Sequence, residues 1–405
     1  MMTTSPEKLI STLSHKITIQ IVFYGLAVSI VAILLVFSSF SIASHASAST
    51  GQGSNEKVRV IAETQEKASA AAADGCTIVR ETKGLKAMVC DARVASILNL
   101  PEDPMVSVMD TGANLQIGAN TVQDLGNNGA GRKIVVLDTG YNYNHVELKS
   151  SYLGGKDFVN NDNDPMDDNG HGSYVAGLIT ADGIRTDARG VAPDAGIISG
   201  KVLGRGGSGF FSDIVAGIYW AVDGPDGVYG TDDDFKADAI NLSLGTSPPL
   251  VFKGYCDNAM PTMTAAIKYA VSKGVAVVIA AGNAGSEGVS IPGCISYATT
   301  VGAVKKTDSI ASFSGRGKAV DITAPGVSLV SAWTGGISVY KVGSGTSDST
   351  PIITATVALI KYNHPSYSQS QVEAALFKTA KDLGPVGKDS RYGYGRVVVP
   401  AAVNY

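Results

Sequence analysis

The sequence predicts an α/β protein with a doubly wound, mainly parallel sheet that has helices on both faces, preceded by a small α+β unit. From residue 131 onward, continuous apolar runs rich in β-branched residues alternate with longer helical patterns. This alternation is typical of a parallel sheet buried on both faces. Glycine is abundant, at 47 residues, and only 17% of residues are charged, which favours tight turns between buried strands over disorder.

Six apolar runs are the candidate strands of this sheet. They span residues 133–138, 195–203, 238–244, 274–281, 299–304 and 320–325. With 405 residues the chain is long enough for one large domain and smaller segments. Because the carboxyl ends of parallel strands lie along one edge, we expect functional residues at those ends.

The N-terminal segment indicates export. An apolar run at 21–37 follows two lysines, and Ala46 and Ala48 fit a small-x-small cleavage site. We expect residues 1–48 to be a signal peptide. The run is also long enough to span a bilayer, so a retained anchor is the alternative. Either way we expect the rest of the chain to be extracellular, secreted or held at the cell membrane through this segment alone.

The four cysteines of an exported chain indicate two disulfide bonds. Residues 76–90 are typical of a hairpin turning at 82–84, and a three-residue loop would place Cys76 opposite Cys90. Cys256 and Cys294 would then form the second pair. Four free buried thiols are the alternative.

Four residues with side chains suited to catalysis stand at the end of a predicted strand or at the start of a predicted helix. Asp138 ends an apolar run, although burying a carboxylate is costly unless it is paired. His171 lies in a glycine-flanked turn that opens a small-residue helix, and Asn283 ends another apolar run. Ser347 lies in a glycine turn entering a helix, where its backbone N–H is free to bind an oxyanion. Each feature alone is weak evidence, but the combination in this order is strong.

Six stretches of the sequence resemble the subtilisin-like serine proteases, from about Ile117 to the C-terminus. They are VLDTGYNYNHVEL around Asp138, GHGSYVAG around His171, NLSLG with AAGN, GTSDSTP around Ser347, and the closing RYGYGRVVVPAAV. The resemblance implies a subtilisin-like fold and a Ser-His-Asp endopeptidase that acts through an acyl-enzyme intermediate without an organic cofactor. In it Ser347 would be the nucleophile, His171 the general base and Asp138 the residue that orients the base, with Asn283 as oxyanion donor.

We expect a protein or peptide substrate to lie between two extended segments, 204–210 and 243–246, adding a strand between them. Glycines in the first segment would leave room for substrate side chains. The candidate substrate-binding residues are Gly207, Ser208, Gly209, Ser243, Leu244 and Gly245.

The chain departs from the family pattern in the His and Ser blocks. Where the family usually has HGTHVAG, Ser173 and Tyr174 stand in the middle; where it has GTSMATPH, Asp348 and Ser349 replace Met and Ala, and Ile352 replaces the final His. We interpret Tyr174 and Ile352 as packing changes.

Asp348 is the departure with chemical consequences. A carboxylate suits the first turn of a helix, but near the oxyanion it would oppose developing charge, and near His171 it would raise the imidazole pKa. We expect a working enzyme with an alkaline-shifted pH profile or a reduced rate. The alternative is a catalytically weakened or inactive subtilisin-like protein that acts as a binding or scaffold module.

Two acidic stretches, 156–170 and 223–234, suit calcium, a hard cation that takes six to eight oxygen ligands. The candidate ligands of a structural calcium ion are Asp157, Asp162, Asp164 and Asp168. Neither stretch has the closing glutamate of an EF-hand. A merely solvated acidic loop is the alternative.

The N-terminal region predicts a precursor. Residues 57–109 weakly resemble the inhibitory propeptide of these proteases, which implies that 49–112 is a propeptide inhibiting its own enzyme and 113–405 the peptidase domain. We expect cleavage within residues 109–118, which we predict to be flexible. A permanent N-terminal domain is the alternative.

Other classes fit the sequence less well. Asp110 and Asp138 both begin a DTG triplet, as in aspartic proteases, but the α/β pattern after Asp138 does not match two β lobes. An α/β-hydrolase needs G-x-S-x-G, and Ser349 breaks that motif. The net charge of −4 and the absence of a basic stripe with interleaved aromatic residues argue against nucleic acid as a partner.

Overall fold

The computed structural model describes residues 57–82, 85–101 and 112–405. The chain divides into two compact units, Met1–Met105 and Val106–Tyr405. The small unit has one hydrophobic core and the large unit has two.

The small unit is α+β over its described residues. Its strands pair antiparallel in the order β1-β3-β2. The elements are β1 (Lys57–Ala62), α2 (Gln65–Ala73), β2 (Thr77–Thr82), β3 (Leu85–Asp91) and α3 (Ala92–Ile97). Polar side chains begin both helices, because Thr64 accepts from the backbone N–H of Lys67 and Asp91 accepts from that of Arg93.

Both predicted disulfides are present: Cys76 is bonded to Cys90 in the small unit and Cys256 to Cys294 in the large one. Covalent cross-links of this kind limit the conformational freedom of the unfolded chain. The pairing that the sequence predicts is therefore confirmed.

The hairpin reaches this pairing by a route different from the predicted one. Thr82 pairs with Leu85, so the strands run one residue further than a three-residue loop allows. An irregularity between Ile78 and Arg80 takes up the extra residue. The register is thereby restored before Cys76.

The large unit is built on a parallel sheet of seven strands in the order β12-β11-β9-β7-β4-β6-β5. The strands are β4 (Lys133–Asp138), β5 (Tyr152–Asp157), β6 (Gly196–Lys201), β7 (Ala239–Leu242), β9 (Ala276–Ala280), β11 (Thr299–Val304) and β12 (Ile322–Pro325). All six predicted strands are present, which confirms the predicted fold class. The sequence missed β5, an edge strand that contains Gly154 and Gly155.

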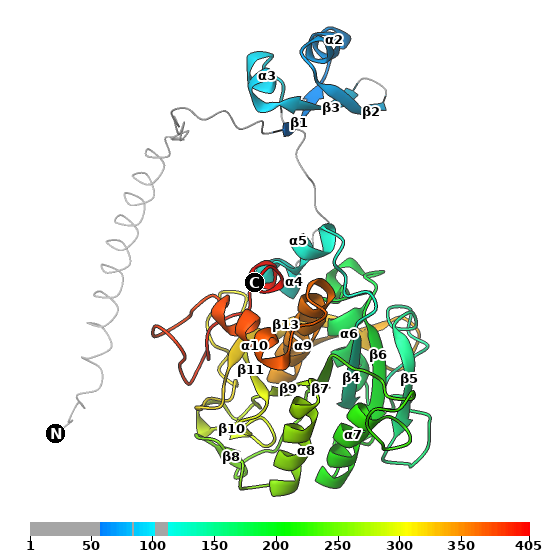
Figure 1. The fold of residues 1–405 in the computed structure, drawn as a ribbon, viewed down its shortest axis with the longest axis vertical. Helices are drawn as coiled ribbons and strands as arrows, with labels where there is room; N and C mark the ends of the chain where they lie inside the picture. Colours follow the sequence, from blue (N-terminus) through cyan, green and yellow to red (C-terminus); the bar gives the residue numbers. More distant parts are fainter. Residues whose placement is uncertain (1–56, 83–84, 102–111) are drawn as a thin grey trace, which may run out of the picture. The chain divides into compact units, whose positions relative to one another are not determined.

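Residues of the central strands β4, β6, β7 and β9 enter two different cores. Ile134 and Val136 of β4 belong to one core, and Val135 and Leu137 belong to the other. The main helices are α6 (His171–Thr180), α7 (Phe211–Asp223), α8 (Pro261–Ser272), α9 (Thr346–Asn363) and α10 (Gln369–Lys378). Figure 1 shows them arranged around the sheet.

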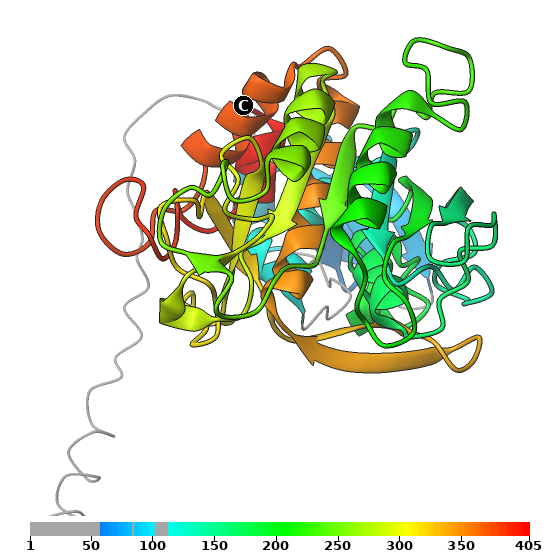
Figure 2. The ribbon, with the colours of Figure 1, turned by 90° about the horizontal axis from the view of Figure 1, so that it is seen from below.

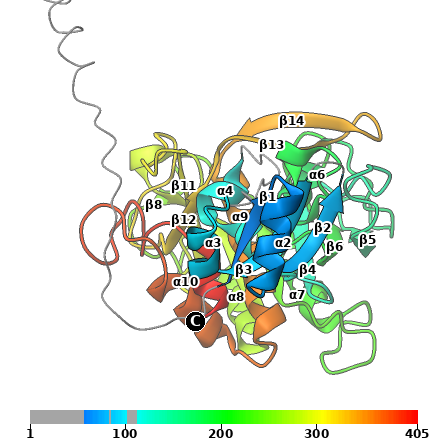
Figure 3. The same ribbon diagram turned by 90° about the horizontal axis from the view of Figure 1, so that it is seen from above.

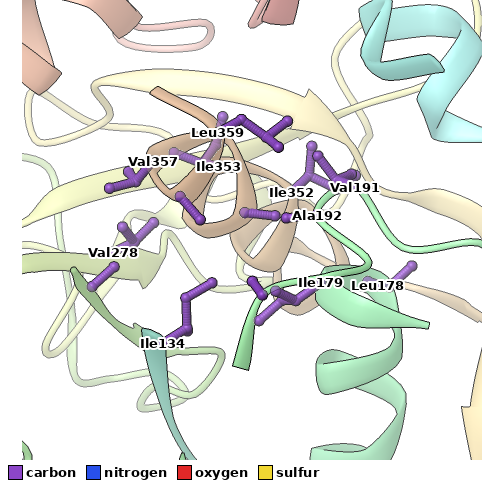
Figure 4. Close-up of a cluster of buried hydrophobic side chains, with 14 of the residues drawn as sticks. Ile134, Leu178, Ile179, Val191, Ala192, Val278, Ile352, Ile353, Val357 and Leu359 are labelled. Carbon is purple, nitrogen blue, oxygen red and sulfur yellow. The ribbon is translucent and has the colours of Figure 1, made fainter. Parts of the chain in front are cut away.

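The two faces of the sheet are covered by different helices. The first core contains side chains of α6, α9 and α10, and the second contains those of α7 and α8. In Figure 2, α7 (green) and α8 (yellow-green) run side by side, with α9 (orange) across the sheet from them. Figure 4 shows Ile353, Val357 and Leu359 of α9 within the first core. Both faces are thus buried, which explains the continuous apolar strand runs.

Shorter elements complete the large unit. They are α4 (Ala113–Ile117), α5 (Ala119–Asp124), β8 (Val251–Phe252), β10 (Val289–Ser290), β13 (Val327–Trp333), β14 (Val339–Ser344) and α11 (Val399–Val403), with 3-10 turns at Thr186–Ala188 and Gly285–Glu287. The hairpin of β13 and β14, which the sequence did not predict, runs along the unit in Figure 3 and leads directly into the turn before α9.

The segment expected to be flexible, 109–118, is ordered over its described part. Residues 113–117 form α4, with Asn114 and Ile117 buried. The amide of Asn114 donates to the carbonyl of Arg189 at 3.0 Å. The expectation of a flexible stretch is therefore wrong from residue 112 onward, and residues 109–111 lie outside the described residues.

Within the described ranges, no helix is long and apolar enough to cross a membrane. The apolar run at 21–37 lies outside them, as do residues 102–109 of the stretch that resembles a propeptide.

Candidate active site

Two of the predicted site residues meet at the carboxyl end of β4. Asp138 is the last residue of β4 and His171 is the first residue of α6. Asp138 is fully buried, and its Oδ1 lies 2.7 Å from Nδ1 of His171. The same oxygen accepts the backbone N–H of Thr139 at 2.7 Å. These two bonds satisfy Oδ1 of the buried carboxylate, whereas Oδ2 has no hydrogen-bond partner in the residues that the structure describes, and the bond to Nδ1 fixes the orientation of the imidazole.

Glycine allows the start of α6 to pack against the chain after β4. The N–H of Gly172 donates to Oγ1 of Thr139 at 2.8 Å. A Cβ on Gly172 would lie 2.1 Å from the carbonyl oxygen of Gly140, which no side chain tolerates. The glycine beside His171 is thus required by close backbone contact, as the sequence indicated.

Asp167 supports the His171 turn, a role that sequence reasoning missed. It is 2% exposed and accepts from Oγ1 of Thr139, from the N–H groups of Asn169 and Gly170, and from both N–H and Oγ of Ser173. Ser173, like the Thr of the family pattern, has a hydroxyl, and this hydroxyl donates to Asp167 and so anchors α6 to the carboxylate. The available signal was an aspartate four residues before a glycine-flanked histidine.

Ser347 is the second residue of α9, where backbone N–H groups have no partner within the helix. Its carbonyl oxygen accepts from Oγ of Ser243 at 2.9 Å. Ser243 in turn accepts from Asn241, which is bonded to Thr354 further along α9. A buried polar network thus fixes the first turn of α9 against the end of β7.

Asn283 follows β9 and faces the same turn. Its Oδ1 accepts from the N–H of Thr346 at 3.0 Å and from the hydroxyl of that residue at 3.1 Å. A Cβ on Gly345 would lie 2.7 Å from Oγ of Ser347 and 3.5 Å from Nδ2 of Asn283. The amide nitrogen and the serine hydroxyl therefore flank the same small volume.

The hydroxyl of Ser347 is bonded to its neighbour. Its Oγ lies 3.3 Å from Oδ1 of Asp348, and the described part of the chain contains no hydrogen bond between Ser347 and His171. The other oxygen of Asp348 accepts from the hydroxyl of Tyr174 at 2.7 Å. The interpretation of Tyr174 as a packing change is wrong, because its hydroxyl contacts a carboxylate of the site. Ile352 is fully buried in the core, as expected.

Burial and charge shift the pKa values in this cluster. Burial raises the pKa of Asp348 to about 6, against the hydrogen bond from Tyr174 and the nearby His171. For His171, burial lowers the pKa, but Asp138, Asp348 and Asp167 together outweigh it and the net shift is upward. Asp348 thus increases the basicity of the imidazole, as the sequence predicted in direction.

A cavity of about 600 Å³ opens beside these residues. His171, Asn283 and Ser347 all line it. The six candidate substrate-binding residues line it as well: Gly207, Ser208, Gly209, Ser243, Leu244 and Gly245. The volume is within the range of ligand sites.

The first of the two wall segments is not simply extended. The N–H of Gly204 donates to the carbonyl of Ser208, and Gly207 has φ +74°, so residues 204–208 close a turn. A Cβ on Gly209 would lie 2.1 Å from the carbonyl oxygen of Val202. Close backbone packing, and not room for substrate, accounts for the glycine at 209.

The acidic stretch expected to bind calcium is folded on itself. Asp157 accepts from the N–H groups of Val159 and Asn160, Asp162 accepts from the N–H of Asp164, and Asp168 pairs with a lysine. Over residues 57–82, 85–101 and 112–405, no three His, Cys, Asp or Glu side chains are grouped so that they could hold a metal ion. The structure does not bring the four predicted ligands, Asp157, Asp162, Asp164 and Asp168, together, because aspartates here cap turns instead.

A buried lysine at the end of β6 was also missed. Lys201 is 1% exposed, and its Nζ donates to the carbonyls of Thr139 and Leu203, at 2.6 and 2.9 Å, and to Oδ1 of Asp168 at 2.7 Å. A charged residue within a predicted buried strand was the available signal. Lys201 fixes the chain immediately after Asp138.

A serine, an Asp–His pair and an asparagine amide at the carboxyl edge of a parallel sheet define the class of a serine hydrolase. The model of the subtilase family matches residues 129–395. The chain therefore belongs to the subtilase family of serine endopeptidases, which confirms the resemblance noted in the sequence.

Named relatives agree with this assignment. The chain is 37% identical over 283 residues to a thermophilic serine proteinase of Bacillus sp. (strain AK1), covering 70% of this chain and 64% of that protein, slightly under two thirds of its length. It is 33% identical over 360 residues to an alkaline protease of Alkalihalobacillus alcalophilus, covering 86% and 85%. It is 37% identical over 287 residues to subtilisin Savinase of Lederbergia lenta, covering 71% and 96%.

Proposed function

We propose that the chain hydrolyses peptide bonds with Ser347 as nucleophile, His171 as general base and Asp138 as the residue that orients the base. The observation that carries the proposal is the 2.7 Å Asp138–His171 pair, whose histidine lines the same cavity as Ser347. Oγ of Ser347 attacks the peptide carbonyl while His171 accepts its proton and then protonates the leaving amine. Water hydrolyses the resulting acyl-enzyme by the same proton path.

Asn283 and the backbone N–H of Ser347 are the proposed oxyanion donors. Both are positioned beside the serine hydroxyl, where negative charge develops in the tetrahedral intermediate. The substrate backbone would lie along segments 204–210 and 243–246, of which residues 207–209 and 243–246 line the cavity. Replacing Asn283 by Ala should lower kcat about a hundredfold or more, a magnitude that comes from this same family.

Labelling with a fluorophosphonate probe tests the nucleophile. Label on Ser347, mapped by mass spectrometry and absent from Ser347→Ala and strongly reduced in His171→Ala, is the expected result. A native protein that carries no label at any pH would favour the alternative, an inactive protein that binds peptides without cleaving them. Asp348 beside the serine is the feature that motivates this alternative.

We also propose that the chain is made as an exported precursor. Residues 1–48 would direct export and 49–112 would act as the propeptide, with cleavage before α4. The support for this boundary is that α4 is anchored to the large unit by the buried Asn114 and Ile117. N-terminal sequencing of the wild type and of Ser347→Ala tests it, because self-processing should fail in the variant.

Calcium binding stays a prediction of the sequence, without support from the arrangement of the predicted ligands. Thermal unfolding in EDTA and in excess calcium tests it. A higher Tm in calcium would show that the chain binds the ion through a set of ligands different from the four predicted carboxylates. Identical unfolding curves would contradict the prediction.

A further inference from the structure

Asp348 connects the nucleophile to a tyrosine on another helix. Asp348 is 4% exposed, and each of its carboxylate oxygens has a different donor. The hydroxyl of Tyr174 lies 2.7 Å from Oδ2 and 2.9 Å from the carbonyl oxygen of Leu329, and its proton goes to the closer, charged acceptor. The hydroxyl of Ser347 donates to Oδ1 at 3.3 Å. The distance from Tyr174 to Oδ2 is typical of a strong charge-assisted bond, whereas that from Ser347 to Oδ1 is long for two oxygens. The carboxylate is therefore held mainly from the Tyr174 side.

The groups around this carboxylate determine its charge. Burial favours the neutral form, while His171 on α6 and Lys341 on β14 favour the ionised form. His171 itself faces Asp138 and Asp167 as well as Asp348. The resulting pKa of about 6 means that Asp348 is ionised in alkaline solution, where it accepts hydrogen bonds and donates none.

We propose that Asp348 competes with His171 for the proton of the Ser347 hydroxyl, and that Tyr174 is a positioning residue that keeps this competition weak. The inference rests on the proposed roles of Ser347 and His171. A serine hydroxyl has one proton, so a bond to Asp348 withholds that proton from the base. Because Tyr174 holds Oδ2, Oδ1 stays at 3.3 Å and the hydroxyl can turn toward His171.

Removing the tyrosine hydroxyl should therefore slow the nucleophile. In Tyr174→Phe the buried, ionised carboxylate loses its stronger donor, and Ser347 is the side-chain donor that remains among the described residues. The hydrogen bond from Ser347 to Asp348 should then become stronger, and the serine proton is less available to His171. We expect the second-order rate of fluorophosphonate labelling at pH 9 to fall about tenfold, which corresponds to strengthening one hydrogen bond to a charged group.

Removing the charge should have the opposite effect. Asp348→Asn keeps an acceptor for Tyr174 but no longer competes as an anion. We expect faster labelling than in the wild type and an acid limb of kcat/KM moved about one pH unit lower, because the negative charge near His171 is gone.

The double variant and a matched control separate positioning from packing. In the Asp348→Asn background, Tyr174→Phe should have no further effect on the labelling rate. Tyr340→Phe is the matched control. Tyr340 lies on β14, and its hydroxyl donates to the buried carboxylate of Glu147 at 2.8 Å, so this substitution also removes a tyrosine hydroxyl from a buried carboxylate. That control should label at the wild-type rate.

Each outcome has one meaning. If Tyr174→Phe lowers the labelling rate equally in the wild type and in the Asp348→Asn background, Tyr174 is a structural residue and the inference is overturned. If Tyr174→Phe alone does not fold, as judged by thermal unfolding, an unchanged labelling rate and acid limb in Asp348→Asn overturn it instead. Failure of the wild type to label at any pH rejects the proposed function, whereas labelling without coupling rejects this inference alone.

Discussion

The hydroxyl of Tyr174 lies 2.7 Å from Oδ2 of Asp348 and so joins the first turns of α6 and α9. These residues stand where the family usually has His and Met. An aspartate alone at this buried position would be short of a donor, because burying a carboxylate is costly unless it is hydrogen-bonded. Tyr174 supplies that donor. The two departures from the family pattern are therefore in direct contact.

Asp348 should destabilise the fold in neutral and alkaline solution. Burial raises its pKa from 3.8 to about 6. Below pH 3.8 the carboxyl is protonated in both the folded and the unfolded state, so it does not change the free energy of unfolding. As the pH rises, the free energy of unfolding falls, and above about pH 6 the loss reaches its full value of about 3 kcal/mol. Asp348→Asn should accordingly raise the Tm at about pH 8 and leave it almost unchanged at about pH 4.

Thermal unfolding checks this pH dependence. Both proteins are compared in a Ser347→Ala background, which prevents self-digestion during heating. An equal Tm difference at the two pH values would contradict the prediction, because it would show that the aspartate acts through packing and not through its charge.

Lys201 should support both stability and turnover. Lys201→Met leaves the carbonyls of Thr139 and Leu203 without this buried donor, at a cost of about 2–4 kcal/mol. Because Thr139 follows Asp138, kcat should fall as well. Chemical denaturation and steady-state kinetics measure the two effects. Asp168→Asn is the matched control: it keeps an acceptor for Nζ of Lys201 and removes only the charge of a side chain that is 46% exposed, so this change should cost less than Lys201→Met.

The sequence predicted those parts of the fold that are buried on both faces. Strands such as β9 read as continuous apolar runs because helices cover the sheet on either side. Strand β5 lies at the sheet edge and includes two glycines, and β14 is half-exposed with Lys341 in its middle. Neither has an apolar run, so local sequence pattern could not predict them.

The same limit applies to the site. Asp138, His171, Asn283 and Ser347 stand in recognisable local motifs, and the structure brings them to one edge of the sheet. The contact of Tyr174 with Asp348 spans 174 positions and depends on how α6 packs against α9. No local pattern encodes such a pairing, and so its two members were interpreted separately.

The Cys256–Cys294 disulfide should hold the substrate cavity in shape. The N–H of Cys294 donates to the carbonyl of Ser290, which lines the cavity. Replacing both cysteines by Ser should cost about 4 kcal/mol of stability and raise KM more than it changes kcat. The same exchange at Cys76 and Cys90, in the small unit, should leave KM unchanged. A KM unaffected by the first pair of substitutions would contradict a role at the cavity.

Activity should resist brief exposure to peroxide. Ser347 is followed by Asp348, where the family pattern has a methionine, and oxidation of a methionine there would place a polar sulfoxide beside the nucleophile. The wild type should retain most of its activity, whereas Asp348→Met should lose most of it under the same treatment. Mass spectrometry of the other methionines shows that oxidation took place in both samples. Equal, rapid inactivation of both proteins would mean that a methionine elsewhere among the eight controls activity.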